Sequence, residues 1–418
     1  MSSRIKYLLL ITKIMIVLML LVYFFDNLII IGIGFLFINM LVFFKPYFSD
    51  IDRNSRNFLL FALLLLVSLF VNLSKYNVVI SNDQFFYVKT ALNGFLWIIL
   101  SYYGYCIGKI IGKDERYLIN LLKFCMYLFL INAVINIYVW FTTTGGVISR
   151  YSFVSPITNT VSAGVVYSLL GYFLTKSLPS RKTLLSFIYG IVFIVNIVIV
   201  GTRQVQLLFC FYLIYYYYIS FVNFKKNRIK IILLVISVAP VIFVGFSALL
   251  PSLAPMYNGV LNLGAPDYYV RQITIRVAYD LFLDNPIFGV GYGMFGVYNT
   301  AIISVSGSTL SSVHNGFYSI LSEWGLMGLL LTMVLFLNIY FTSRKLLTAG
   351  KSISKLNIVS IIFLRGTIIV FFISNFDLFP PPNERSYYLF GFIMWILYGS
   401  ISQEVINKSK NFLDEVKA

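Results

Sequence analysis

Apolar residues dominate the chain in long runs that short polar stretches separate. A helix of about twenty apolar residues is long enough to cross the roughly 30 Å hydrocarbon core of a bilayer. The pattern therefore predicts an all-α, polytopic membrane helix bundle of about 12 transmembrane helices. The expected spans are residues 7–25, 27–44, 57–73, 85–108, 117–141, 161–176, 184–201, 205–222, 230–249, 315–341, 356–375 and 386–402.

The polar connections between these spans are short, with two exceptions at residues 142–160 and 250–313. Within the second, apolar positions recur at helical spacing over residues 271–285, which predicts a short amphipathic helix that Pro286 ends. The sequence contains no internal repeat and no second soluble domain. We therefore expect residues 1–418 to form a single integral membrane domain, with 250–313 as a long periplasmic or extracellular loop within it.

The composition supports the same class, because 59% of the residues are hydrophobic and only 11% are charged. A soluble domain carries about 25% charged residues, so this chain lacks the polar surface that a water-soluble globule needs. Arg4 and Lys6 precede the first apolar run, which continues to Phe25 without a small-residue cleavage site. We expect this run to be an uncleaved first helix rather than a signal peptide.

The net charge of +17 would suggest a nucleic-acid partner in a soluble chain, but the basic residues follow the predicted topology instead. An even number of spans places both termini on one side, and 22 of the 32 Lys and Arg residues fall there. By the positive-inside rule this side is the cytoplasm, and the charge needs no nucleic acid to explain it. The outer side has six basic residues, namely Lys75, Arg150, Arg203, Arg271, Arg276 and Arg385.

Outer-face arginines are candidates for phosphate binding, because the guanidinium group can donate to two oxygens at once. Arg203 follows the span 184–201, and Arg271 lies in the long outer loop. The alternative role is an anchor that reaches lipid headgroups. Arg276 has a further alternative, since Asp280 and Asp284 follow at helical spacing and could pair with it.

His314 is the only histidine in the chain, and it lies where the long outer loop re-enters the membrane. A neutral imidazole can accept a proton from a sugar hydroxyl as a general base, although a helix-capping or interfacial role is the common alternative. Glu323 lies deeper in the same span, where a carboxylate indicates a cavity or an ion pair with an inward Arg or Lys. Arg365 lies in the middle of a span and must face the bundle interior, a cavity or a carboxylate.

A glycine-rich segment, Gly289-Val290-Gly291-Tyr292-Gly293, follows the predicted amphipathic helix. A nucleotide-binding loop would need a preceding strand, and a potassium filter would lie in a small symmetric pore. We therefore interpret the segment as a tight turn that directs the loop back into the membrane.

Taken in order along the chain, these segments resemble one family, the O-antigen polymerases and O-antigen ligases. The resemblance is densest over residues 201–328, and Arg150–Pro156 is a further similar segment. The segments that carry it are Gly201-Thr202-Arg203, Arg271, Asn285-Pro286-Ile287-Phe288-Gly289-Val290-Gly291-Tyr292-Gly293, His314-Asn315 and Glu323-Trp324-Gly325-Leu326-Met327-Gly328.

The resemblance implies a glycosyltransferase without a cofactor, whose donor is a polyprenyl-diphosphate-linked oligosaccharide. Arg203 and Arg271 would stabilise the leaving diphosphate, and His314 would orient or deprotonate the attacking sugar hydroxyl. Ile275 departs from the family pattern, so the choice between Arg271 and Arg276 stays open. No acidic cluster with metal-ligand spacing occurs on the outer face, so metal-independent transfer is expected. Further substrate contacts are expected from Arg276, Arg150, Asn315, Glu323 and Arg385.

The favoured function is polymerisation of lipid-linked repeat units into O-antigen or a related surface polysaccharide. An O-antigen ligase, which would transfer the polysaccharide to lipid A-core, shares the donor and stays an alternative. A flippase for the same lipid-linked units would show two related halves and short outer loops, and an ion channel is a more distant alternative. We expect a bacterial inner-membrane protein in contact with lipids, with both termini cytoplasmic and the active site facing the periplasm. A chain-length regulator protein could be a further partner.

Overall fold

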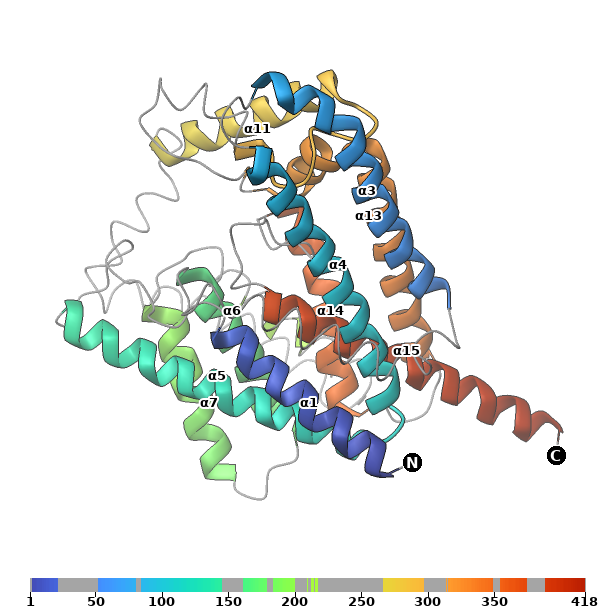
Figure 1. Ribbon diagram of the computed structural model, residues 1–418. Helices are drawn as coiled ribbons and strands as arrows, with labels where there is room; N and C mark the ends of the chain where they lie inside the picture. Colours follow the sequence, from blue (N-terminus) through green and yellow to red (C-terminus); the bar gives the residue numbers. More distant parts are fainter. Residues whose placement is uncertain are drawn as a thin grey trace.

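The structure, a computed structural model, has ten helices and no strand within its described residues (Figure 1). The described residues are 2–21, 52–79, 84–144, 161–178, 183–199, 209, 212–213, 215–216, 266–296, 313, 315–348, 354–373 and 388–417. The helices are α1 (Ser2–Leu21), α3 (Arg53–Val79), α4 (Gln84–Ile111), α5 (Glu115–Thr144), α6 (Val161–Ser177), α7 (Thr183–Ile199), α11 (Pro266–Asp284), α13 (Gly316–Thr348), α14 (Lys355–Ile373) and α15 (Tyr388–Lys417). The predicted all-α fold is confirmed for this part of the chain.

Nine of the twelve predicted spans coincide with helices of the structure. The expected spans 27–44 and 230–249 lie outside the described residues, and 205–222 is described only at a few helical positions. The predicted amphipathic helix is α11, which ends at Asp284, directly before Asn285 and Pro286. Asn-Pro ends a helix at this point because the proline ring disfavours helical backbone in the residue before it.

Three helical segments are long and apolar enough to cross a membrane, judged within the described ranges by length and composition. They are Asn54–Asn72, Glu115–Thr142 and Gly316–Thr348, and Trp97–Ile111 and Leu184–Ile197 are shorter apolar helices. Large apolar side chains such as Leu63, Phe70 and Phe141 are exposed on these helices. Exposed apolar helix faces are expected where lipid is the solvent, and the count of twelve spans stays a prediction.

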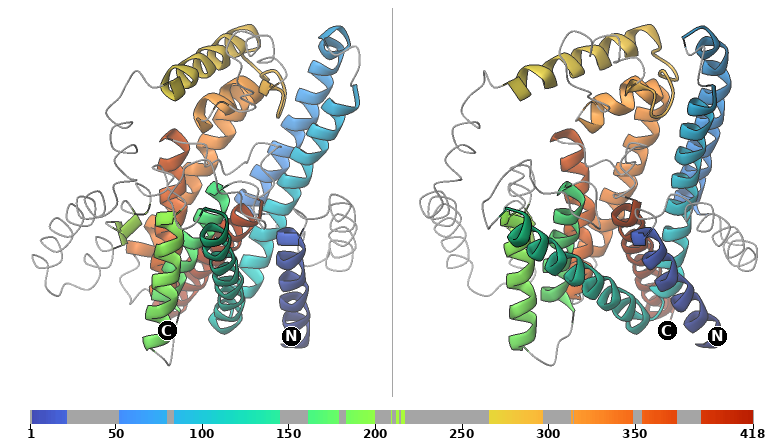
Figure 2. Two further views of the ribbon diagram at one scale, coloured as in Figure 1. Left: turned by 90° about the vertical axis from the view of Figure 1, so that its left-hand side faces the viewer. Right: turned by 60° about the vertical axis from the view of Figure 1, so that its left-hand side comes forward.

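The most extensive helix contact in the described part of the chain joins α4 to α15 (Figures 1 and 2). Glycines at four-residue spacing on α4 face the backbone of α15, since a Cβ atom added at Gly104 would lie 2.9 Å from the carbonyl oxygen of Phe392. A Cβ atom added at Gly108 would clash with the carbonyl group of Ile396. Small residues at this spacing let two membrane helices approach closely enough for backbone packing.

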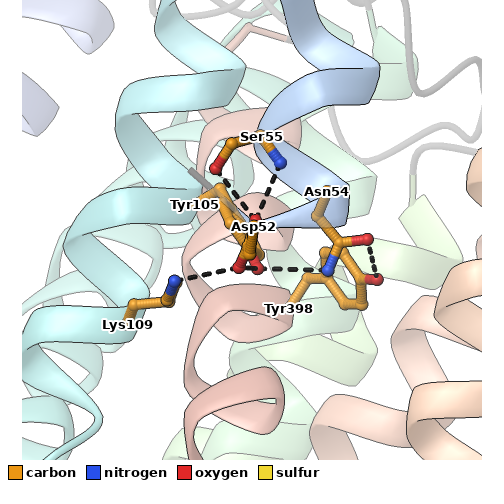
Figure 3. Close-up of polar contacts among 6 residues, drawn as sticks. All are labelled: Asp52, Asn54, Ser55, Tyr105, Lys109 and Tyr398. Carbon is orange, nitrogen blue, oxygen red and sulfur yellow. Dashed lines mark hydrogen bonds and ion pairs between the residues drawn. The ribbon is translucent and has the colours of Figure 1, made fainter. Parts of the chain in front are cut away.

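Asp52 caps the beginning of α3 and ties it to α4 (Figure 3). One carboxylate oxygen accepts hydrogen bonds from the backbone N–H and the hydroxyl of Ser55, both at 2.9 Å. The other oxygen accepts from the Tyr105 hydroxyl at 2.6 Å and from the Lys109 ammonium at 2.9 Å. The side chain of Asp52 therefore satisfies a helix-end N–H group and pairs with a charge of the neighbouring helix.

Asn54 extends this cluster to α15. Its amide nitrogen donates to the Tyr105 hydroxyl at 3.1 Å, and its amide oxygen accepts from the Tyr398 hydroxyl at 3.0 Å. Side-chain hydrogen bonds thereby join the beginning of α3 to α4 and to α15, which is distant from both in the sequence.

The charge of Asp52 is expected to stabilise the fold, which Asp52→Asn tests because asparagine can still cap α3. Burial opposes ionisation of Asp52, but the hydrogen bonds from Tyr105 and Lys109 outweigh it and hold the pKa of Asp52 below its usual range. We expect Asp52→Asn to lower the free energy of unfolding by about 1–3 kcal/mol near pH 7. A lowered pKa contributes stability above the usual aspartate value of about 3.9, and this contribution is lost as the pH falls through the folded-state pKa.

Thermal unfolding in detergent across a pH series measures this effect. The difference in melting temperature between the wild type and Asp52→Asn should narrow below about pH 4. Asp114→Asn is the matched control, because Asp114 pairs with an Arg116 side chain that is 90% exposed and exposed pairs contribute little. An equal loss of melting temperature in Asp52→Asn and Asp114→Asn would contradict the assigned role of Asp52. So would a difference in melting temperature between the wild type and Asp52→Asn that widens in acid.

Candidate functional site

The first turn of α13 begins next to His314, the predicted catalytic histidine. The amide oxygen of Asn315 accepts hydrogen bonds from the backbone N–H groups of Phe317 at 3.0 Å and Tyr318 at 3.3 Å. Asn315 is therefore the N-cap of α13. His314 directly precedes it and lies outside the described residues. Substrate contact by Asn315 stays a prediction beside this capping role.

Helix α13 is interrupted at Gly325, whose backbone has φ 64° and ψ −162°. An unbroken helix would pair the N–H of Leu326 with the carbonyl of Ser322, and the N–H of Met327 with the carbonyl of Glu323. The interruption removes these two hydrogen bonds and leaves four backbone groups to be satisfied. In a bilayer an unsatisfied backbone group costs several kcal/mol, so each group needs another partner.

Residues 286–293, which we call the glycine turn, supply all four partners. The carbonyl oxygens of Ser322 and Glu323 accept hydrogen bonds from the N–H groups of Val290 at 2.8 Å and Gly291 at 2.9 Å. On the other side of the interruption, the N–H of Leu326 donates to the Pro286 carbonyl at 2.8 Å, and the N–H of Met327 donates to the Ile287 carbonyl at 3.2 Å. Residues 286–291 therefore replace the missing helical hydrogen bonds of α13.

The predicted tight turn is confirmed, because Gly289, Gly291 and Gly293 all have positive φ angles of 65°, 106° and 72°. Close approach adds a second requirement for glycine at two positions. A Cβ atom added at Gly289 would lie 2.6 Å from the carbonyl oxygen of Glu323, and one added at Gly325 would lie 2.5 Å from the carbonyl oxygen of Ile287. The turn and α13 thus fit together only with glycine on both sides of the contact.

The side chain of Glu323 faces the turn and is almost completely buried, with 6% of its surface exposed. Its two carboxylate oxygens accept hydrogen bonds from the backbone N–H groups of Gly293 at 2.9 Å and Phe295 at 3.3 Å. No Lys, Arg or His pairs with it among the residues that the structure describes. The expected alternative, an ion pair with an inward Arg or Lys, is therefore not formed in this part of the chain.

Helix α3 holds the same turn from another side. The hydroxyl of Ser68 donates to the carbonyl of Phe288 at 3.3 Å, and the amide nitrogen of Asn72 donates to the carbonyl of Gly289 at 3.2 Å. Neither residue was among the predicted site residues. A buried asparagine in an apolar helix is the signal that could have found them, because such side chains usually hydrogen-bond to a neighbouring element.

Aromatic side chains also pack against the glycine turn. The ring of Tyr292 lies edge-on to Trp324, with 5.4 Å between ring centroids, and Trp324 meets Phe61 of α3 at 6.0 Å. Tyr292 also fills the space beside Gly94 of α4, where an added Cβ atom would lie 2.5 Å from the tyrosine ring. Three helices therefore contact one short turn.

Helix α11 lies across the beginning of α13 (Figure 2). A small apolar cluster, separate from the main core, consists of buried Ala278 of α11 with Phe295 and Val313. Tyr318 of α13 packs against this cluster. Because Val313 is the residue before His314, the cluster fixes α11 to the backbone that leads into the histidine.

The structure places some of the predicted site residues and not others. Arg271 and Arg276 both lie on α11, and Arg276 is exposed. Arg276 forms no ion pair with Asp280 or Asp284 in the described part of the structure. Three further predicted site residues lie outside the described residues, as His314 does, and these are Arg150, Arg203 and Arg385.

Arg365 contacts side chains of other helices rather than an acidic side chain of the described residues. Its guanidinium group donates to the Ser343 hydroxyl at 2.8 Å and to the Tyr215 hydroxyl at 3.2 Å, and it lies 4.9 Å from the ring centroid of Tyr340. The prediction that Arg365 faces the bundle interior is therefore confirmed. In the described ranges, no three His, Cys, Asp or Glu side chains are grouped to hold a metal ion, and metal independence stays a prediction.

Comparison with known proteins agrees with this arrangement. Residues 188–333 match the family described as O-antigen ligase. The matched region runs from α7 to the middle of α13 and contains α11, the glycine turn and Glu323. The match confirms the resemblance to O-antigen polymerases and ligases over this part of the chain. No curated protein matches the chain.

Proposed function

We propose that this protein polymerises oligosaccharide repeat units linked to polyprenyl diphosphate, at the periplasmic face of the bacterial inner membrane. The observation that carries the proposal is the packing of α11, with its two arginines, against Val313, the residue before the only histidine. This packing supports the proposal, because it joins the helix whose sequence carries two arginines to the residue before His314, and diphosphate displacement by a sugar hydroxyl needs both residue types.

In the proposed reaction, the acceptor hydroxyl oxygen forms a bond to the anomeric carbon of the donor sugar. The bond from that carbon to the diphosphate oxygen breaks, and its electron pair leaves with the polyprenyl diphosphate. His314 takes the hydroxyl proton. Arg203 and Arg271 stabilise the charge on the departing diphosphate, and no metal ion is required for these steps.

Helical periodicity favours Arg271 over Arg276 as the loop arginine that meets the diphosphate. Thr274 and Ala278 are fully buried, and they are the buried positions of α11 within residues 272–284. Position 271 precedes them by three and seven residues, which places it on the same helix face at about 100° per residue. Position 276 lies on the opposite face by the same count and is exposed.

We therefore expect Arg271→Ala to reduce turnover of lipid-linked repeat units by about 10²- to 10³-fold, and Arg276→Ala to have a smaller effect. Both variants alter one arginine of the same helix, so each controls for the other. The measurement is the rate of polysaccharide formation by purified protein in detergent or liposomes. A larger loss from Arg276→Ala would reverse the assignment of the two arginines.

The acceptor distinguishes the polymerase from the alternative function, that of an O-antigen ligase. Purified protein is given lipid-linked repeat units alone and then together with lipid A-core. Ladders of repeats on the polyprenyl carrier in the first reaction support the polymerase. Product that forms only when lipid A-core is present supports the ligase, and no product in either reaction contradicts the proposed transfer.

A further inference from the structure

We propose that Glu323 is a positioning residue for this reaction, which fixes α11 relative to the segment that leads into His314. The inference rests on the proposed function. Glu323 lies eight residues after Asn315, about 12 Å along the helix axis at 1.5 Å per residue. At this depth it acts through other residues of the site.

The chemistry of the carboxylate fits the two N–H groups that it meets. One oxygen accepts from Gly293 and the other from Phe295, so both oxygens act as acceptors. A glutamine would offer only one acceptor oxygen, and its NH₂ group would face the second N–H group. The geometry therefore favours a carboxylate over the neutral amide of similar shape.

The two donors lie at and just beyond the end of the turn, on the side that is further from α11 in the sequence. Gly293 ends the glycine turn, and Phe295 is fully buried against Ala278 of α11 and Val313. Any displacement of the Phe295 backbone therefore moves a side chain that both α11 and Val313 contact. Glu323 holds this backbone in place from α13.

The backbone hydrogen bonds at the interruption hold a different part of the same segment. They fix residues 286–291 to α13, whereas Glu323 fixes Gly293 and Phe295 two and four residues further on. Loss of Glu323 should therefore release Phe295, and with it the packing contact to Ala278 of α11, while residues 286–291 stay docked on α13. This separation makes a local effect on α11 distinguishable from unfolding of the site.

The test combines distance measurements with kinetics in Glu323→Ala and Glu323→Gln. Spin labels on cysteines introduced at the exposed positions Gln272 of α11 and Leu330 of α13 report the distance between these helices. A second labelled pair, at exposed Tyr138 of α5 and Leu184 of α7, reports the rest of the fold. Native cysteines that react with the label are replaced by serine in all samples.

We expect Glu323→Ala to broaden the α11–α13 distance distribution and to leave the α5–α7 distribution unchanged. The kcat for lipid-linked repeat units should fall by about 10- to 100-fold, with KM within about twofold of the wild type, because misplacement by about 1 Å can reduce rates by this factor. The distance distribution and the kcat of Glu323→Gln should lie between those of the wild type and Glu323→Ala. Glu404→Gln is the matched control, since this glutamate lies on α15 about 3.9 Å from Lys408 and away from the turn.

Two results would overturn the proposal. One is an unchanged α11–α13 distribution with wild-type kcat in Glu323→Ala, and the other is equal broadening of both labelled pairs, which would assign Glu323 a general role in folding. If the wild type shows no turnover of lipid-linked units, the proposed function fails. In that case the two distance distributions still decide whether Glu323 holds α11.

Discussion

Replacing His314 with alanine should reduce the turnover of polyprenyl-diphosphate-linked repeat units by about 10²- to 10⁴-fold, the usual contribution of a general acid or base. The reason is chemical, because a sugar hydroxyl is a poor nucleophile until its proton is removed. His314 is the only imidazole in the chain, so no second histidine can replace it. Single-turnover assays with purified protein measure the chemical step directly.

The donor should still bind to His314→Ala, since the proposed diphosphate contacts come from Arg203 and Arg271. Binding of radiolabelled lipid-linked donor to the wild type and the variant measures this separately from turnover. Thermal unfolding should also be unchanged, because Asn315 caps α13 and is retained in this variant. A variant that forms polysaccharide at the wild-type rate would exclude His314 as the base.

Replacing Gly325 with alanine should abolish most activity, through the backbone rather than through a side chain. The combination of φ 64° and ψ −162° is essentially restricted to glycine, and another residue costs about 1–3 kcal/mol there. The added Cβ atom would also lie 2.6 Å from the backbone nitrogen of Gly289. The turn would have to move away from α13. Four backbone groups of α13 and four of the turn would then lose their hydrogen-bond partners.

We expect Gly325→Ala to lower turnover by about 100-fold or more, as misplacement of a site does, and to lower the melting temperature. Protease digestion in detergent should show faster cleavage near residues 286–291. Gly190→Ala on α7 is the matched control, because a Cβ atom there would lie 3.7 Å from Tyr172 in ordinary contact. Gly→Ala within a helix is neutral or stabilising when space allows. Similar losses in the two variants would show that the conformation of Gly325 is not the cause.

The helices could be predicted from the sequence because length and hydropathy are local properties. Runs such as 117–141 and 161–176 correspond to α5 and α6 within a few residues. The end of α11 was also predictable, since Asn285-Pro286 disfavours helix wherever it occurs. The glycine turn followed from three closely spaced glycines, because glycine adopts positive φ without strain.

The interruption of α13 could not be predicted, because Gly325 lies within a continuous apolar run and its partners are residues 286–291 in a distant segment. Glu323 was correctly expected to need a partner or a cavity, but the partners are backbone N–H groups. Backbone groups carry no signature in the sequence, so side-chain reasoning suggested an Arg or Lys instead. Ser68 and Asn72 were missed for the same reason, since both donate to carbonyl groups of the turn.

The close contact between α4 and α15 has a consequence for biogenesis. Helix α4 is synthesised nearly 300 residues before α15, so its row of glycines has no α15 backbone to pack against until α15 is inserted. A chain truncated before Tyr388 would leave that row facing lipid, without the partner that fits it. The contact between α4 and α15 therefore forms late in synthesis, and a ribosome that stops before α15 should yield a product that membrane quality-control proteases remove.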